Sequence, residues 1–389
     1  MLTVNGRISL SRRRYFAKGV GSFSPLDDWV DPSHAGISHG AREMACRLNQ
    51  GSRCFAKAAE NMARTAQLRI SREALRQLVI AEGKAVQAAE REGRLVLAWD
   101  AGECFVPDAR GRPTSATRVY LGVDGVMVPH VTQAEKDKRR AQVKAKRRRR
   151  GRKCRPLAKA RPGSDERFKE VKVVTFYDEP CDRRLVLLTR GNCAEAGRLM
   201  RRAAGLVRLS RAQDKVGIVD GAEWIRNQVK QQSLPLDDLG LDFYHLAENV
   251  HKARRAVYGE EAPEDKAAPG NAWAASVLHL ARHHSYVEFE EAVWDWAFRW
   301  RGAERKAGLA LLNYISEREG MIKYKEFKDK GRQIGSGPTE SMCKATTLRV
   351  KGLGKKWDGD NVEAVMTLEA LDQSGAWEKY WGLTPCLAV

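Results

Sequence analysis

The chain has 389 residues, 43% of them hydrophobic, and carries 69 Lys or Arg against 49 Asp or Glu, a formal charge of +20. This length allows two or three domains with a sizeable core, and the charge favours a polyanionic partner, with nucleic acid as the first candidate. The sequence contains no apolar run near the roughly 20 residues of a spanning helix, and its start lacks the apolar centre of a signal peptide. We therefore expect a cytoplasmic, nucleoid-associated protein with no membrane partner.

The cysteines are scattered along the chain without any CxxC pair. This spacing indicates neither a zinc ribbon nor a disulfide framework. We expect the eight residues to be reduced and mostly structural: Cys46, Cys54, Cys104, Cys154, Cys181, Cys193, Cys343 and Cys386.

The amino-terminal part is predicted to contain a weakly ordered edge followed by a helical module. Short apolar and basic alternation over 3–20 and turn formers over 22–32 predict short strands and a loop within 1–34. Over 35–95 apolar residues recur every three or four positions in three sets, which predicts three helices, with Ser71 capping the third. This helix-turn-helix-like module would present one helix to a DNA major groove, or would only be a small packing unit.

Beyond Gly93 the pattern changes to short β-branched runs bounded by polar turns, which predict strands. The runs are LVLAWD, RVYLGVDGVMVPHV, FKEVKVVTFYDE, RRLVLLTRG and DKVGIVDG. Helices are predicted over 192–209, 222–232 and 246–258, with a short strand LDFYH before the last. This order indicates an α/β layered domain over 96–259.

The second half of the chain is predicted to leave this domain and return to it. Residues 260–272 are rich in Pro, Gly, Ala and charge, and a helical insertion over 260–330 follows from the pattern. The glycine-bearing turn GRQIGSG leads to a helix near Pro338, and a last helix spans about 360–373, so that 331–377 completes the core before a tail over 378–389. Four aromatic residues of the insertion would form helical core or stack on DNA bases: Trp294, Trp296, Phe298 and Trp300.

A basic tract interrupts the predicted sheet. Between Lys136 and Arg161 there are fifteen Lys or Arg and one acid, a net +14 of the chain's +20. The tract lies between two predicted strands, as an insertion over 134–163 in a hairpin. Such a run repels itself, and we expect it to be disordered without a partner. Phosphate neutralisation explains it better than a solvated linker or a targeting signal.

Three carboxylates stand out by their position. Asp124 lies in the middle of the strand YLGVDGVMV, Asp220 ends the run VGIVD, and Glu340 lies in the first turn of the helix opened by Pro338. Each has an ordinary explanation alone, such as a helix cap for Asp220 or a favourable contact with the helix dipole for Glu340. Together, two strand aspartates and a helix glutamate can converge on Mg²⁺ or Mn²⁺, with two ions acting on a phosphodiester.

These residues lie in motifs that resemble one family, the bacterial insertion-sequence transposases of the Kra type, which are relatives of the Mutator-like superfamily. The motifs are YLGVDGVMVP, IVDGAEWI, DFYHLAENVHKA, IGSGPTESMCK and RVKGLGKKW, and with the following helix the resemblance covers about residues 4–377. The resemblance implies an RNase H-like fold, in which a mixed sheet is flanked by helices and interrupted by a helical insertion. It also implies that Asp124, Asp220 and Glu340 bind the metal ions. It also implies that Asp242 and His245 are active-site residues, although His245 would equally suit a core position.

The same resemblance implies an activity and partners. A DDE transposase cleaves and joins DNA at element ends, binds double-stranded DNA at those ends and at the target, and acts as a homo-oligomer on DNA. The segment RRRYFAKGVGSF lacks the cysteines that related elements have nearby, so no zinc is expected there. The chain begins close to that segment, which leaves open whether amino-terminal DNA-binding sequence of longer relatives is missing. The alternatives are another RNase H-like nuclease or resolvase, or a catalytically decayed DNA-binding repressor.

Overall fold

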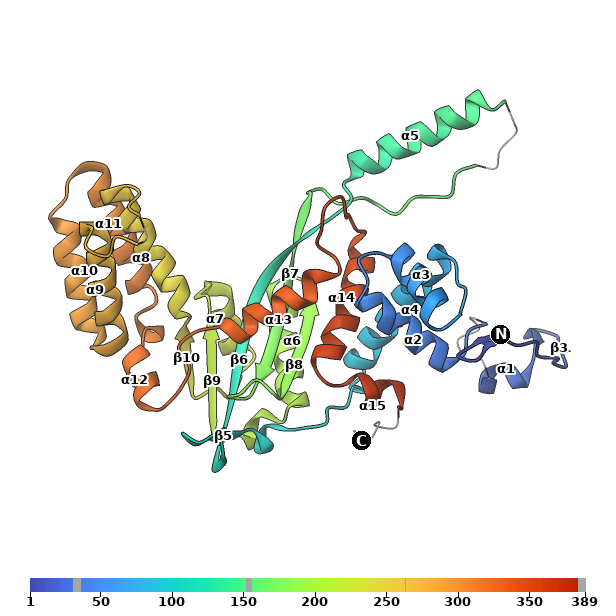
Figure 1. The fold of residues 1–389 in the computed structure, drawn as a ribbon, viewed down its shortest axis with the longest axis horizontal. Helices are drawn as coiled ribbons and strands as arrows, with labels where there is room; N and C mark the ends of the chain where they lie inside the picture. The colour runs from blue at the N-terminus through green and yellow to red at the C-terminus, as the bar shows by residue number, and fades with distance from the viewer. Residues whose placement is uncertain (31–35, 152–155, 263, 384–389) are drawn as a thin grey trace.

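The protein is described by a computed structural model that covers residues 1–30, 36–151, 156–262 and 264–383 (Figure 1). This part of the chain is a mixed α/β structure, with a central sheet that has helices packed against it, a helical body at each end and one long helix that projects from it. Within these residues no helix combines the length and the apolar character that a membrane crossing requires. The six cysteines of this part are free thiols, as predicted, and Cys154 and Cys386 lie outside it.

The first 30 residues form two small antiparallel pairs and a helix. Strand β1 pairs with β2, and β3 pairs with β4. The prediction of a loop over 22–32 is wrong in part, because a helix begins at Pro25. The fixed φ of proline suits a first helical position. The rest of that loop, from residue 31, lies outside the described residues. The elements are β1 Leu2–Thr3, β2 Gly6–Arg7, β3 Tyr15–Ala17, β4 Gly21–Phe23 and α1 Pro25–Val30.

The three helices predicted over 35–95 are present, as α2 (His39–Gln50), α3 (Phe55–Thr65) and α4 (Arg72–Arg91). Ser71 caps α4 as predicted, with its side chain accepting a hydrogen bond from the backbone of the first turn. Beyond its first two turns α4 is mostly buried, and at Gly83 it lies so close to the backbone of Ala364 that a Cβ atom there would overlap it. The module is therefore packed against the carboxy-terminal part of the chain.

The central sheet has the strand order β10-β9-β6-β7-β8, with β5 paired to one end of β6. Strand β7 is antiparallel to both of its neighbours, β6 and β8, whereas β9 and β10 run parallel to β6. The strands are β5 Phe105–Pro107, β6 Pro113–Pro129, β7 Phe168–Tyr177, β8 Arg184–Thr189, β9 Asp214–Val219 and β10 Asp238–Leu241.

Two strand predictions are wrong. The run LVLAWD, residues 95–100, forms no strand, because Asp100 caps the short helical turn η1 (Ala101–Glu103) instead. The run LDFYH contributes only Leu241 to β10, since the next helix begins at Phe243 with Asp242 as its N-cap. In both places an aspartate accepts hydrogen bonds from the backbone of a following turn, and this ends the extended conformation.

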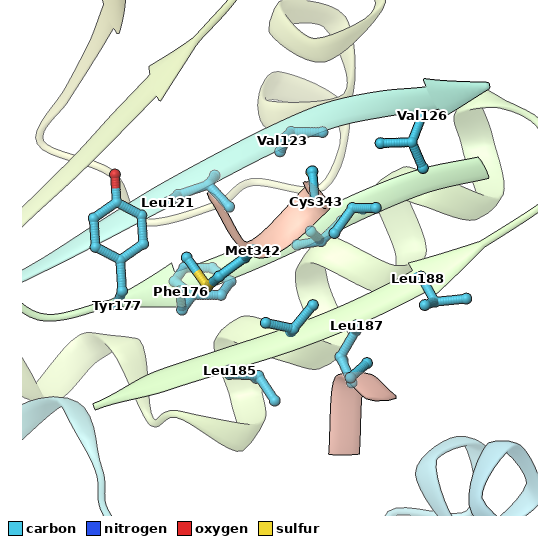
Figure 2. Close-up of a cluster of buried hydrophobic side chains, with 14 of the residues drawn as sticks. Leu121, Val123, Val126, Phe176, Tyr177, Leu185, Leu187, Leu188, Met342 and Cys343 are labelled. Atoms are coloured by element: carbon cyan, nitrogen blue, oxygen red, sulfur yellow. The ribbon is translucent and has the colours of Figure 1, made fainter. Parts of the chain in front are cut away.

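Helices cover the sheet and complete its core. Figure 2 shows Met342 and Cys343, from the helix that carries Glu340, packed among β6 and β7 side chains such as Leu121 and Phe176. That helix, α13, crosses β6 and β7, while α14 packs against β8 and α4. The helices outside the insertion are α6 Cys193–Leu206, α7 Glu223–Gln231, α8 Phe243–Tyr258, α13 Gly337–Leu348, α14 Gly359–Gln373 and α15 Trp377–Trp381. The predicted tail from 378 thus begins inside α15, whose Trp377 and Trp381 are buried, and residues 384–389 lie outside the described part.

The predicted helical insertion is confirmed as helical and forms one end of the molecule (Figure 1). Trp296 is buried and stacks on Trp273 with ring centroids 3.8 Å apart, and Trp300 is half-buried, so these residues belong to the helical core. Trp294 and Phe298 are exposed instead and stack on each other. The helices are α9 Pro269–His283, α10 Tyr286–Phe298, α11 Gly302–Ser316 and α12 Tyr324–Asp329.

The basic insertion connects β6 and β7, as predicted, but the expectation of disorder is wrong for its first half. Residues Gln133–Arg149 form helix α5, which projects away from the body of the protein and buries none of its residues (Figure 1). A capping box between Thr132 and Glu135 begins the helix, and the last turn consists of basic residues that interact favourably with the helix dipole. Residues 152–155 of the tract lie outside the described residues.

Candidate active site

Three aspartates lie next to one another across three neighbouring strands. Val123 of β6 is paired with Val219 of β9, and Val219 is paired with Leu241 of β10. The residue that follows each of these is an aspartate: Asp124, Asp220 and Asp242. Because the three strands are parallel, these side chains meet at the same edge of the sheet, where α/β proteins bind their ligands.

Asp124 is half-buried between β6 and the helix α13. Its carboxylate accepts hydrogen bonds from the backbone N–H of Gly125 at 2.6 Å and from the thiol of Cys343. Burial raises the pKa of Asp124, the two hydrogen bonds oppose this rise, and the carboxylate of Asp220 adds to it. Asp124 is therefore held in a site where its negative charge is costly without a positive partner.

The close approach of α13 to this strand depends on a glycine. A Cβ atom at Gly122 would overlap the side chains of Thr339 and Thr175, whose hydroxyl groups are hydrogen-bonded to each other at 3.1 Å. Gly122 and Asp124 are two positions apart on one strand and so face the same side of the sheet. The helix that carries Glu340 is thus seated directly over the strand that carries Asp124.

Asp220 lies immediately after β9, at the turn into α7. Its side chain accepts a hydrogen bond from the backbone N–H of Ala222 at 2.8 Å, and Gly221 adopts a positive φ of 79°. The helix-cap explanation does not hold, because the N-cap of α7 is Ala222, which makes no side-chain capping bond. The carboxylate interacts electrostatically with Asp124 and with His245.

Asp242 and His245 form a tightly bonded pair at the start of α8. Asp242 is fully buried, and its Oδ2 accepts hydrogen bonds from His245 Nδ1 at 2.6 Å and from the His245 backbone N–H at 3.1 Å. Its Oδ1 accepts from the backbone N–H of Ser336 at 2.8 Å. Burial alone would raise the pKa of Asp242, but these hydrogen bonds outweigh it, and the pKa is lowered.

The hydrogen bond to Asp242 raises the pKa of His245 to about 9, although burial opposes this. At neutral pH the pair is therefore an aspartate and an imidazolium. His245 is not a core histidine, because 36% of its side chain is exposed. With Nδ1 bonded to Asp242, the group that His245 offers to the rest of the site is Nε2.

Glu340 is exposed in the first turn of α13 and completes the site from the other side. Ligand atoms of Asp242, His245 and Glu340 all lie within 4.8 Å of one another, the spacing of a metal-binding group. The tightest group in the described residues is therefore not the predicted set of Asp124, Asp220 and Glu340. Asp124 and Asp220 flank it, linked to it by electrostatic interaction with His245.

The five residues together form a site of four carboxylates and one imidazolium, with oxygen atoms as most of its ligands. Such a set suits a hard divalent cation, which would also offset the charge of the half-buried Asp124. Binding through His245 would use Nε2 and would release its proton. The predicted residues Asp124, Asp220, Asp242, His245 and Glu340 are thus all brought to one edge of the sheet.

Sequence analysis missed Cys343, which bonds to Asp124 and interacts electrostatically with Glu340. Burial and these negative neighbours raise the pKa of its thiol well above the usual range, so it acts as a neutral hydrogen-bond donor. The spacing of three between Glu340 and Cys343 was a usable signal, because such residues share one face of a helix. Searches with this sequence found no matching protein-family model and no matching curated protein.

Proposed function

We propose that the protein is a metal-dependent DNA transposase of the DDE type, with an RNase H-like catalytic domain. The observation that carries this proposal is the in-register row of Asp124, Asp220 and Asp242, with Glu340 placed against it by α13. A sheet of three antiparallel strands continued by two parallel ones, with helices packed on it and a helical insertion before α13, supports the RNase H-like assignment.

The carboxylates would hold Mg²⁺ or Mn²⁺, and two such ions would activate a water or a 3′-hydroxyl and stabilise the leaving oxygen of a phosphodiester. Asp124 and Asp220 would serve one side of the site, and Asp242 with Glu340 the other. His245, held by Asp242, would orient its Nε2 toward the reacting phosphate or ligate an ion after losing its proton. Cys343 positions the Asp124 carboxylate.

The basic surfaces of the chain support double-stranded DNA as the partner, both as element ends and as target, bound by a homo-oligomer. Helix α5 adds a row of cations on a helix that buries none of its residues. Another RNase H-like nuclease or resolvase would use the same carboxylates, so strand transfer into target DNA is the activity that separates the two. A decayed repressor would have no reason to keep five such residues at one edge.

The proposal is tested by replacing carboxylates with amides, which preserve shape but remove a charged oxygen ligand. Asp124→Asn and Asp220→Asn should abolish Mg²⁺-dependent cleavage and strand transfer of an element-end duplex, while binding of that duplex survives. The matched control is Asp329→Asn, an exposed acid on α12 in the helical insertion. Full cleavage activity in the Asp220→Asn variant would refute the proposed mechanism.

A further inference from the structure

A pocket with a basic lining lies where the helical module meets the rest of the protein, and none of the site carboxylates lines it. It has a volume of about 590 Å³ and lies between the first turns of α3 and α4, the base of α5 and the segment that joins α13 to α14. Its lining is basic, because two acids, Glu73 and Asp358, stand against six cationic residues: Arg72, Arg76, Arg139, Arg349, Lys355 and Lys356.

Arg349 is the most unusual of these residues, because it is 96% buried without a carboxylate partner in the described part of the chain. Its guanidinium donates to the backbone oxygen of Asn49 at 3.1 Å and to the Asn49 side chain at 2.9 Å. It also lies over the rings of Phe55, at 4.6 Å, and Trp357, at 5.8 Å. Burial lowers the pKa of Arg349 to about 10, which reflects the cost of an uncompensated charge.

Three further cations of the lining also have no carboxylate bonded to them in the described residues. Lys355 donates only to backbone oxygens, of Arg349 at 3.0 Å and Lys351 at 3.3 Å, and in the described residues neither Arg72 nor Arg139 forms a salt bridge. The two remaining cations are paired, Arg76 with Glu73 and Lys356 with Glu135. The pocket therefore contains four positive charges whose field is not cancelled by a bonded carboxylate.

Cys54 lies within reach of this field. It is exposed at the edge of the pocket, where its sulfur caps α3 and accepts a hydrogen bond from the backbone of Lys57 at 3.4 Å. That hydrogen bond lowers the pKa of the thiol most, and the charges of Arg349 and Lys355 lower it further. The positive potential therefore reaches the mouth of the pocket, where an external anion would enter.

We infer that this pocket binds a phosphate group of the DNA backbone, as a subsite separate from the carboxylates. That the anion belongs to DNA rests on the proposed function. Val131 lines the pocket and lies seven residues beyond Asp124, the last two of them past the end of β6 at Pro129. At the rise of an extended chain this separation corresponds to roughly 23 Å. For a duplex that runs alongside β6, the bound phosphate would lie about seven nucleotides from the cleaved bond, at about 3.4 Å of rise each.

The first test measures the salt dependence of duplex binding by the full chain in the absence of divalent metal. Replacing Lys355 and Arg139 by Gln should reduce the slope of log K against log salt by about 0.9 for each lost contact. Lys306→Gln, which removes an exposed cation from α11 at the opposite end of the molecule, should leave the slope unchanged. An unchanged slope in the double variant, with an unchanged melting temperature, would overturn the inference.

The second test uses Cys54 as a reporter that needs no substitution. Iodoacetamide should alkylate Cys54 in the free protein, and a saturating element-end duplex should slow that reaction, as measured by mass spectrometry of the Cys54 peptide. Alkylation at the same rate with and without duplex would overturn the inference even if the protein cleaves DNA. Protection of Cys54 by a duplex that is never cleaved would support the pocket while refuting the transposase proposal.

Discussion

The Nδ1 atom of His245 donates a hydrogen bond of 2.6 Å to Oδ2 of Asp242, a carboxylate with no exposure to solvent. The other oxygen of Asp242 accepts from the backbone N–H of Ser336, the residue before α13. One buried aspartate therefore fixes both the imidazole of α8 and the start of the helix that carries Glu340. A change at Asp242 should disturb the two sides of the site at once.

This pair predicts a specific pH dependence of stability for the metal-free protein. The pKa of His245 is raised to about 9 from 6.5, so its contribution is fully present below pH 6.5 and is lost as the pH rises through about 9. The pKa of Asp242 is lowered, so its contribution is present above the ordinary range of an aspartate and is lost on strong acidification. The melting temperature in EDTA should therefore fall between pH 6.5 and 9.

Replacing His245 with Asn should flatten this fall, because the titrating group is gone. His284→Asn is the matched control, since His284 is a partly exposed histidine at the C-cap of α9 and bonds to Glu288. The control should melt with the same pH profile as the unchanged protein. An identical fall in the His245→Asn variant would assign the pH dependence to another group.

Deletion of the basic tract Lys136–Arg161 tests what its charge does. Because α5 buries none of its residues, replacing the tract with a short Gly-Ser turn between β6 and β7 should leave the fold intact. Binding to non-specific DNA should weaken and its salt slope should flatten, since the tract supplies sequence-independent phosphate contacts. Equal slope and affinity after deletion would make the tract a linker, the alternative that its composition allowed.

Recognition of the element ends is predicted to use the first turns of α4, in which Arg72 and Gln77 are exposed. From Leu78 onward the helix is largely buried, so only its amino-terminal end can enter a major groove. Gln77→Ala in the full chain should reduce the preference for element ends over random duplex, measured by competition binding. A preference that is unchanged in both Arg72→Ala and Gln77→Ala variants would remove this module from sequence recognition.

The sequence predicted the elements that have strong local signals. The three amino-terminal helices, four of the five long strands and the helix at Pro338 follow from periodicity and caps, and the structure contains them. The prediction of a strand at LVLAWD failed because Asp100 caps a helical turn instead. The prediction of disorder failed for the early part of the basic tract because a capping box offsets the repulsion of its charges. Short-range hydrogen bonds of this kind can stabilise a different backbone conformation from the one that the residue composition favours. A pattern of residue types does not show which conformation is the more stable.

The candidate site could be predicted only in part, for a physical reason. Local patterns placed Asp124, Asp220 and Glu340 on their elements, but the distances among them depend on strand register and on the seating of α13, which no local pattern encodes. The compact group of Asp242, His245 and Glu340 arises from the bond between Asp242 and Ser336, 94 positions apart. Long-range contacts of this kind come from the packing of the whole domain.

Gly122 links the packing of α13 to the site. A methyl group there would overlap the hydroxyl of Thr339, so Gly122→Ala should displace α13 and lower the free energy of unfolding by about 1–3 kcal/mol. The matched control is Gly205→Ala on α6, where no neighbouring atom lies within 4 Å of the added carbon, so its stability should not fall. Urea unfolding of the two variants measures this difference.

The displacement should also separate catalysis from binding. In Gly122→Ala every carboxylate is still present, but Glu340 is moved away from Asp242 and Asp124, so cleavage should fall while element-end binding is retained. Adding Thr339→Ala removes the hydroxyl that the methyl group meets and should restore part of both stability and cleavage, a coupling expected only for residues in direct contact. Strictly additive losses in the double variant would mean that α13 is not seated on β6 through this pair, and the route by which Glu340 reaches the aspartates would have to be different.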